Sequence, residues 1–125
     1  FYGGWEGDSK NAVTGKGLTS EEVEAQKFFT HLFNWRKTAT AIHNGKFKHY
    51  APEKNDAYVY FRYNDTQKIM VILNKNDKKI TLDMKTYQDM IPSIFNAKDA
   101  LSGKEINVNG TLEVAPKSAL ILEIK

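Results

Sequence analysis

Residues 56–74 read DAYVYFRYNDTQKIMVILN, and this stretch decides the fold of the chain. Two runs rich in β-branched and aromatic residues flank a polar tip at 64–67, which is the strongest β-hairpin pattern in the sequence. Apolar residues occupy both faces of both runs, so the two strands are predicted to lie inside a sheet and not at its edge. Tyr58, Tyr60 and Arg62 share one face of the first strand, opposite to Val59 and Phe61.

Short strands are predicted on both sides of this hairpin, near 46–50, 80–84, 106–108, 112–114 and 119–124. Asn109-Gly110 predicts a two-residue turn that pairs the 106–108 strand with the 112–114 strand. The last run is almost wholly apolar and is therefore predicted to be a central strand. A single helical turn is expected over 86–90. The predicted fold class is mainly β, an antiparallel Greek-key β-sandwich preceded by one long or broken helix.

The helix is predicted from its own start and stop signals. Thr19 and Glu22 have the spacing of a capping box, and Asn44-Gly45 supplies the end, with Gly45 in the left-handed conformation. A break near Asn34 is expected because the helix would otherwise exceed the usual length. An apolar stripe with helical periodicity runs along it: Ala25, Phe28, Phe29, Leu32, Trp35 and Ala39. The predicted division is a loop and helix over 1–45 and a sandwich over 46–125.

The stripe has three interpretations. It can cover one face of the sheet that follows, pack on a part of a longer polypeptide, or form a homodimer through Phe28, Phe29, Leu32 and Trp35. The chain begins with Phe1 and not with Met, which is expected of a processed product or a piece of something longer.

Composition and spacing exclude several classes of function. The net charge is +3, and the lysines are dispersed among acidic residues, so no nucleic-acid partner is predicted. The absence of cysteine rules out a disulfide framework and a thiol nucleophile, and no apolar run approaches the roughly 20 residues of a membrane span. His31, His43 and His49 lack metal-ligand spacing, and no phosphate-binding loop is present, so neither a metal nor a cofactor is predicted.

No catalytic site is predicted from the residues alone. The serines lack a nucleophile elbow. Glycoside hydrolysis needs two carboxyl groups flanking one bond, but the acids here lie mainly in turns and at helix starts, where solvated or capping carboxylates belong. They include Asp8, Glu21, Glu22, Glu53, Asp56, Asp65, Asp77 and Asp99.

Several segments together resemble the C-terminal end of α-amylase-superfamily glycoside hydrolases, and within them the cyclomaltodextrinase and neopullulanase branch. Residues 1–8, FYGGWEGD, resemble a Phe-Pro-Gly-Gly-Trp-x-Gly-Asp loop that follows the late barrel strands, with Tyr2 in place of Pro. Residues 33–46 resemble the last barrel helix and its ending. Four further segments resemble the strands and the closing segment of a C-terminal β-sandwich, namely 58–62, 70–74, 99–104 and 112–116.

This resemblance implies that catalysis and this chain belong to different parts of a longer polypeptide. In the family the catalytic carboxylates lie on earlier strands of a (β/α)₈ barrel, so the activity belongs to a parent polypeptide and no residue of this chain is catalytic. The loop at 1–8 is the one piece expected near the substrate cleft, which makes Trp5 and Asp8 the candidate substrate-binding residues. Periplasmic and secreted locations in a bacterial parent both fit, and the compartment is left open.

Three functions therefore stand as hypotheses. The first is a non-catalytic C-terminal sandwich that stabilises its own catalytic barrel in the parent chain. The second is an autonomous carbohydrate-binding module that contacts α-glucan through its six Tyr, seven Phe and two Trp residues. The third is an oligomerisation module that uses the helix stripe.

Overall fold

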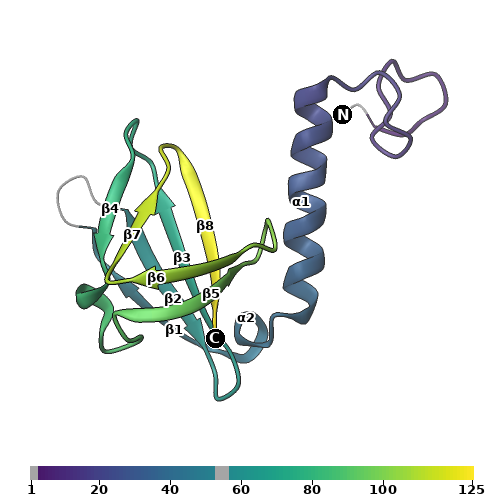
Figure 1. The fold of residues 1–125 in the computed structure, drawn as a ribbon. Coiled ribbons are helices and arrows are strands. Elements are labelled where there is room, and N and C mark those ends of the chain that lie inside the picture. The colour runs from purple at the N-terminus through teal and green to yellow at the C-terminus, as the bar shows by residue number, and fades with distance from the viewer. Residues whose placement is uncertain (1–2, 53–56) are drawn as a thin grey trace. The chain divides into compact units, whose positions relative to one another are not determined.

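The computed structural model describes residues 3–52 and 57–125 (Figure 1). Its contacts divide the chain into two compact units, Phe1–Asn34 and Trp35–Lys125, and each is described here by itself. The first unit holds a loop and most of α1 (Ser20–Thr38), whereas the second holds the end of α1, the short helix α2 (Thr40–Asn44) and the strands. The predicted boundary at Lys46 stays a prediction.

Helix α1 begins with the predicted capping box. The Glu22 amide donates to Thr19 Oγ1 at 3.2 Å, and Glu22 Oε2 accepts from the Thr19 amide at 2.8 Å. The predicted break at Asn34 is wrong, because the helix continues to Thr38 and stops at Ala39, whose ψ of 83° leaves the helical region. Ala39 is also the first fully buried residue after α1, so the chain bends where it meets the core of the second unit. Neither α1 nor α2 combines the length and the apolarity needed to cross a bilayer.

The glycine after α2, Gly45, is required because a side chain there would clash with neighbouring backbone, and not because the position has a left-handed conformation. The prediction of a left-handed Gly45 is wrong, since its φ of −85° and ψ of 160° are those of extended backbone. A Cβ at this position would lie 2.1 Å from the Ala41 carbonyl oxygen and 2.9 Å from the Tyr63 carbonyl oxygen. Gly45 therefore lets the chain pass from α2 into the first strand directly beside the second.

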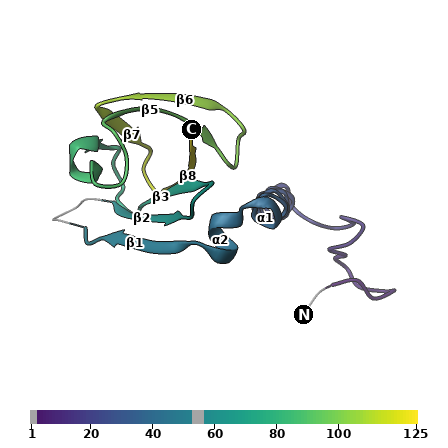
Figure 2. The same ribbon diagram turned by 90° about the horizontal axis from the view of Figure 1, so that it is seen from below.

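Eight strands follow, and every neighbouring pair is antiparallel. Their order in the sheet is β1-β2-β3-β8-β5-β6-β7-β4, and Figure 2 shows that β5 and β6 lie in one layer and β1, β2 and β3 in another. The mainly β, antiparallel prediction is confirmed, whereas the Greek-key connectivity stays a prediction. The strands span β1 (Lys46–Tyr50), β2 (Tyr58–Tyr63), β3 (Lys68–Asn74), β4 (Ile80–Asp83), β5 (Ile94–Asp99), β6 (Glu105–Asn109), β7 (Thr111–Val114) and β8 (Ser118–Ile124).

The β2–β3 hairpin and the central position of β8 are both confirmed. At the hairpin tip, Asn64 Oδ1 accepts from the amides of Thr66 and Gln67 at 3.0 and 2.8 Å, which fixes the turn. Asp56, the first residue of the predicted hairpin segment, lies outside the described residues, as does Glu53. Strand β8 pairs with β3 along its whole length and with β5 near its C-terminal end.

The predicted pairing of the strands on either side of Asn109-Gly110 is present next to the turn, but the expected partners of Ile106 and Val108 are wrong. The chain does turn at Gly110, whose φ is +77°, but β6 and β7 share only the Asn109–Thr111 pair. Strand β6 pairs with β5, and β7 pairs with β4. The helical turn expected over 86–90 begins two residues earlier, as a 3₁₀ helix η1 (Met84–Tyr87), because the Asp83 side chain caps it by accepting from the Lys85 amide.

The hydrophobic core lies between the two layers. Its largest fully buried side chains are Phe61, Met70, Ile72, Met84 and Leu122, which come from β2, β3, η1 and β8. Since β2 contributes one face to this core through Val59 and Phe61, its other face, with Tyr58 and Tyr60, points outward.

Asn74 is the buried polar residue whose loss should be most costly. It is 3% exposed, and its Nδ2 donates to the carbonyl oxygens of Lys78 and Ala115 at 3.1 and 2.8 Å. We expect Asn74→Ala to lower the free energy of unfolding by about 3 kcal/mol, because it leaves buried carbonyl groups without donors. Urea unfolding followed by circular dichroism measures this.

Asn107→Ala is the matched control for Asn74→Ala. Asn107 is exposed on β6, and among the described residues its side chain bonds only to that of Asn96, at 2.7 Å. Its replacement should change the unfolding free energy by no more than about 0.5 kcal/mol. Equal losses for the two variants would contradict the role given to Asn74.

Candidate functional site

The front loop of the first unit is organised by the Asp8 carboxylate. Asp8 Oδ2 accepts from the amides of Gly3, Gly4 and Trp5 at 3.1, 3.3 and 3.3 Å. Gly4 and Gly7 have φ values of +137° and +99°, which let the backbone wrap around the carboxylate. The three amides, that of Gly3 first, hold the pKa of Asp8 below its ordinary value, since each stabilises the charged form.

Trp5 and Asp8, the two predicted substrate-binding residues, are brought together in this turn. The Asp8 amide donates back to the Trp5 carbonyl oxygen at 3.2 Å. The Trp5 side chain is 80% exposed, so its indole is available for stacking, whereas the bonded Asp8 oxygen already serves the loop itself. Tyr2, the position where this loop departs from the family pattern, lies outside the described residues.

The loop is attached to α1 within the same unit. Lys10 Nζ lies 2.5 Å from Glu22 Oε1, and Gln26 Nε2 donates to the Ala12 carbonyl oxygen at 2.7 Å. A further turn is closed by Asn11, whose Oδ1 accepts from the amides of Val13 and Thr14 at 2.9 Å each. The part of the loop that follows the Trp5 turn is therefore held on the first turns of the helix.

Helix α1 presents an uncovered aromatic surface. Phe28, Phe29 and Phe33 are 44%, 51% and 54% exposed. Their ring centroids lie 5.6 Å apart for Phe28 and Phe29 and 5.9 Å apart for Phe29 and Phe33. Phe33 was not part of the predicted stripe, although its i+4 spacing from Phe29 is the signal that identifies it. Leu32, which was part of the stripe, is half-buried.

Trp35, at the start of the second unit, differs from these phenylalanines because it has a polar partner. Its Nε1 donates to Glu123 Oε1 on β8 at 2.6 Å. The same carboxylate oxygen accepts from Gln67 Nε2 at 3.4 Å, and Gln67 Oε1 accepts from the Ala41 amide at 3.1 Å. This network joins the end of α1, α2 and the β2–β3 hairpin tip.

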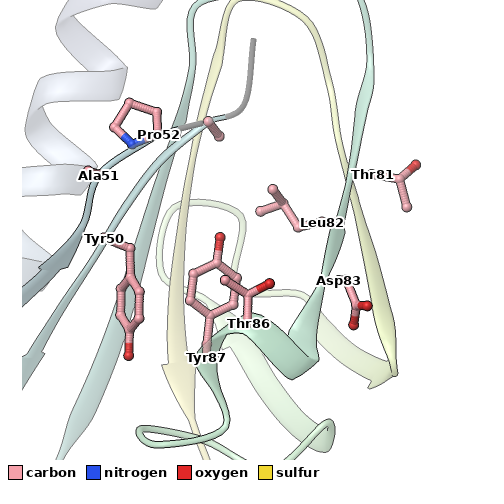
Figure 3. A pocket seen from close by; sticks show the side chains of 9 residues that line it. Tyr50, Ala51, Pro52, Thr81, Leu82, Asp83, Thr86 and Tyr87 are labelled. Carbon is pink, nitrogen blue, oxygen red and sulfur yellow. The ribbon is translucent and has the colours of Figure 1, made fainter. Parts of the chain in front are cut away.

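The second unit also contains a cavity of about 420 Å³ beside η1 (Figure 3). The Tyr50 and Tyr87 rings meet edge to face at 4.9 Å on one side of it, and in Figure 3 the Thr81 side chain points away from them. Tyr50 and Lys48 both bond to the Asp89 carboxylate, which ties β1 to the segment after η1. The cavity is lined by Tyr50, Ala51, Pro52, Ala57, Thr81, Leu82, Asp83, Thr86 and Tyr87.

The other titratable side chains that the structure describes make local contacts. The hydrogen bond from Lys48 to Asp89 raises the pKa of Lys48. The pKa of Asp89 is lowered, first by the bond from Lys48 and second by the bond from Tyr50. His43 Nε2 lies 2.8 Å from the Arg36 carbonyl oxygen, and His49 stacks on Phe47. Within residues 3–52 and 57–125, no three His, Asp or Glu side chains are grouped so as to hold a metal ion.

A family model described as the cyclo-malto-dextrinase C-terminal domain matches residues 47–123. The chain belongs to the cyclomaltodextrinase C-terminal domain family. This match begins within β1 and ends within β8, so the family domain is the sandwich itself. The predicted membership of the α-amylase superfamily is confirmed at this level, and the cyclomaltodextrinase or neopullulanase subtype of the parent stays a prediction.

Solved structures share the fold of this family domain. A variant of AmyP in complex with maltotriose is 17% identical, with a TM-score of 0.74, over 89% of this chain and 23% of that one. An Anoxybacillus α-amylase is 18% identical, with a TM-score of 0.63, over 86% and 23%. The trehalulose synthase MutB from Pseudomonas mesoacidophila is 17% identical, with a TM-score of 0.65, over 97% and 24%. The chain thus spans about a quarter of the length of these relatives.

We expect the structure of the Asp8 turn to depend on pH. Because the folded-state pKa of Asp8 is depressed, its contribution to the turn is present at pH values above the unfolded value and is lost as pH falls through the folded value. The amide resonances of Gly3, Gly4 and Trp5 should therefore shift together, with a midpoint below about 3.9. A pH titration by ¹H–¹⁵N NMR measures this, and Asp8→Asn should abolish the shared transition. A common midpoint that survives in Asp8→Asn would refute the assignment.

Proposed function

We propose that this chain is the non-catalytic C-terminal part of an α-glucan-degrading glycoside hydrolase of the cyclomaltodextrinase or neopullulanase type, and that it stabilises the catalytic barrel of its parent. Residues 1–45 would be the last loop and helix of that barrel, and 46–125 its Greek-key C-terminal sandwich. The family match over 47–123 supports the second part. The relatives of the same fold, which are about four times as long, are consistent with a larger parent.

The observation that carries the proposal is the exposure of α1. None of its 19 residues is buried, although it contains three phenylalanines and a tryptophan. An amphipathic helix of a globular protein normally buries its apolar stripe, because most helical stability in proteins comes from packing of that face. A catalytic barrel that contains α1 would supply a partner for this apolar face.

The front loop would lie at the edge of the substrate cleft of the parent. Trp5 offers an exposed indole for stacking on a glucose ring, and Asp8 holds the turn that positions it. On this view Trp5 contacts substrate, whereas Asp8 acts as a positioning residue. The AmyP relative was solved with maltotriose, and a malto-oligosaccharide is the substrate class that we propose for the parent here.

The first test separates the chain from its parent. The pure 125-residue chain should release no reducing sugar from maltoheptaose or β-cyclodextrin, because the catalytic carboxylates are expected upstream. Removal of residues 46–125 from the parent should lower the temperature at which its hydrolytic activity is lost. Hydrolysis by the isolated chain, or a truncated parent of unchanged thermal stability, would overturn the proposal.

The second test concerns Trp5. In the parent, Trp5→Ala should raise the KM for maltoheptaose on the order of two- to tenfold, which is the range that aromatic contacts usually contribute. Val13→Ala is the matched control, since Val13 is 85% exposed in the same loop. Initial-rate kinetics decide between them, and an unchanged KM in Trp5→Ala would remove Trp5 from the substrate site.

Two other roles remain as outcomes of simple measurements on the isolated chain. Heat released on titration with maltoheptaose would favour a carbohydrate-binding module that contacts α-glucan. A concentration-dependent dimer in sedimentation, abolished by Phe29→Ser, would favour self-association through the surface of Phe28, Phe29, Leu32 and Trp35.

A further inference from the structure

The sheet of the second unit is open between its two ends. Its strand order begins with β1 and ends with β4, so each of these two strands has one neighbour and one unpaired edge. Residues of both strands line the cavity of about 420 Å³ beside η1, together with residues of η1 itself (Figure 3). The cavity therefore lies at the opening between β1 and β4, and we call it the seam pocket.

The inner wall of the seam pocket is apolar. Leu82 and Tyr87 are buried members of the hydrophobic core, and the half-buried Tyr50 packs against that core. In Figure 3 the Leu82 side chain points toward the two tyrosine rings. The Tyr50 hydroxyl bonds to the Asp89 carboxylate, which also binds Lys48, so the Tyr50 ring is held in a fixed orientation. A ligand that enters the pocket would meet a preformed apolar surface.

The rim of the seam pocket carries polar side chains. Asp83 Oδ1 accepts from the Lys85 amide at 2.9 Å, whereas Asp83 Oδ2 has no partner among the described residues. The Thr86 hydroxyl likewise makes no hydrogen bond within the part of the chain that the structure describes. Asp83 and Thr86 are both exposed. The rim thus offers a carboxylate oxygen as an acceptor and a hydroxyl group that can donate or accept.

The unpaired edge of β4 adds backbone groups to this rim. The Met84 amide donates to the Gly110 carbonyl oxygen at 2.9 Å, which continues the register of β4 with β7. Backbone groups alternate between the two sides of a strand, so those of Leu82 also point to β7, and those of Thr81 and the Asp83 amide point to the opposite side. No described strand pairs with β4 on that side. Two amide donors and one carbonyl acceptor therefore face the opening between β1 and β4.

The charge of the seam pocket selects the class of ligand. Among the described residues that line it, Asp83 is the one charged side chain. A carboxylate opposes an anionic ligand, and a single carboxylate is too few to hold a metal ion. What remains is a set of donors and acceptors beside an apolar wall. These groups fit a neutral ligand that has several hydroxyl groups and an apolar ring face.

We propose that the seam pocket binds a single pyranose unit of a sugar. Its volume lies near the lower end of the roughly 300–1,000 Å³ of small-molecule sites, which suits a ligand of one ring. The sugar hydroxyls donate to Asp83 Oδ2 and to the Thr81 carbonyl oxygen and accept from Thr86. The C–H face of the ring packs on Tyr50 and Leu82. The site is independent of the proposed barrel contact, because all its lining residues belong to the second unit.

Binding is measured by a ¹H–¹⁵N NMR titration of the 125-residue chain with glucose. A ligand of about twelve non-hydrogen atoms should bind with a Kd of about 1–10 mM. The amide resonances of Thr81, Asp83 and Thr86 should shift together as glucose is added. Sorbitol, which has the hydroxyl groups without the ring, should bind more weakly. Equal affinity for glucose and sorbitol would overturn the assignment of a pyranose.

Two variants and a control locate the site. Asp83→Asn keeps η1 capped, because Asn and Asp cap helices about equally well, but it removes the charged acceptor. Thr86→Val removes the hydroxyl group at nearly the same side-chain shape. Each should weaken glucose binding about three- to tenfold. Thr81→Val is the matched control, since the Thr81 side chain points away from the tyrosine rings in Figure 3, and it should leave the Kd unchanged.

The remaining outcomes separate the source of the sugar and the two proposals. If maltoheptaose shifts the same amides, the ligand is the end of an α-glucan chain, and if glucose alone does so, it is a free monosaccharide; both results support the site. Unchanged affinity in both Asp83→Asn and Thr86→Val, or shifts confined to residues outside the pocket, would overturn it. If no sugar binds but removal of residues 46–125 still destabilises the parent, the pocket is refuted and the proposed function stands.

Discussion

The structure of the second unit depends on β8. This strand pairs with β3 over seven residue positions, from Ser118 to Ile124, and its last residues also pair with β5. One strand thus belongs to both layers, and the sheet turns at it to enclose the core. Leu122 is fully buried where β8 joins the two layers. Its neighbour Glu123, on the opposite face, accepts a hydrogen bond from the Trp35 indole. The same short stretch therefore joins the two layers to each other and binds the Trp35 side chain.

Local patterns predicted the parts of the fold that local chemistry controls. The capping box at Thr19, the Asn64 turn and the apolar last strand were all correct, since each depends on residues close in sequence. The expected extent of the β6–β7 pairing was wrong, because Asn109-Gly110 specifies a turn but not how far the strands that leave it stay paired. The end of α1 was misplaced for a similar reason. Ala39 breaks the helix where tertiary burial begins, and no residue near it carries a stop signal.

In the candidate site, too, the sequence identified local features but not the contacts that depend on the folded structure. The resemblance identified the loop with Trp5 and Asp8. Only the structure shows that their surroundings differ, because the Asp8 carboxylate accepts three amides of its own turn whereas the Trp5 side chain is exposed. The alternation in β2 revealed two apolar faces without indicating which one the core would use. Val59 and Phe61 became fully buried, and Tyr58 and Tyr60 became the outer surface. That assignment depends on the second layer, which is built from residues 80–114 and so lies at least 17 positions further along the chain.

The outer face of β1 and β2 carries the amphipathic side chains His49, Tyr58 and Tyr60 beside Phe47. Tyrosine and histidine each combine an apolar ring with a polar group, so they are less costly to expose during folding than Leu or Ile would be. On the edge strand β1, Lys46 and Lys48 flank Phe47, and charged residues at an edge oppose pairing with other chains. Phe47 is thereby exposed on the outer face while the charges beside it on the same strand resist edge-to-edge association.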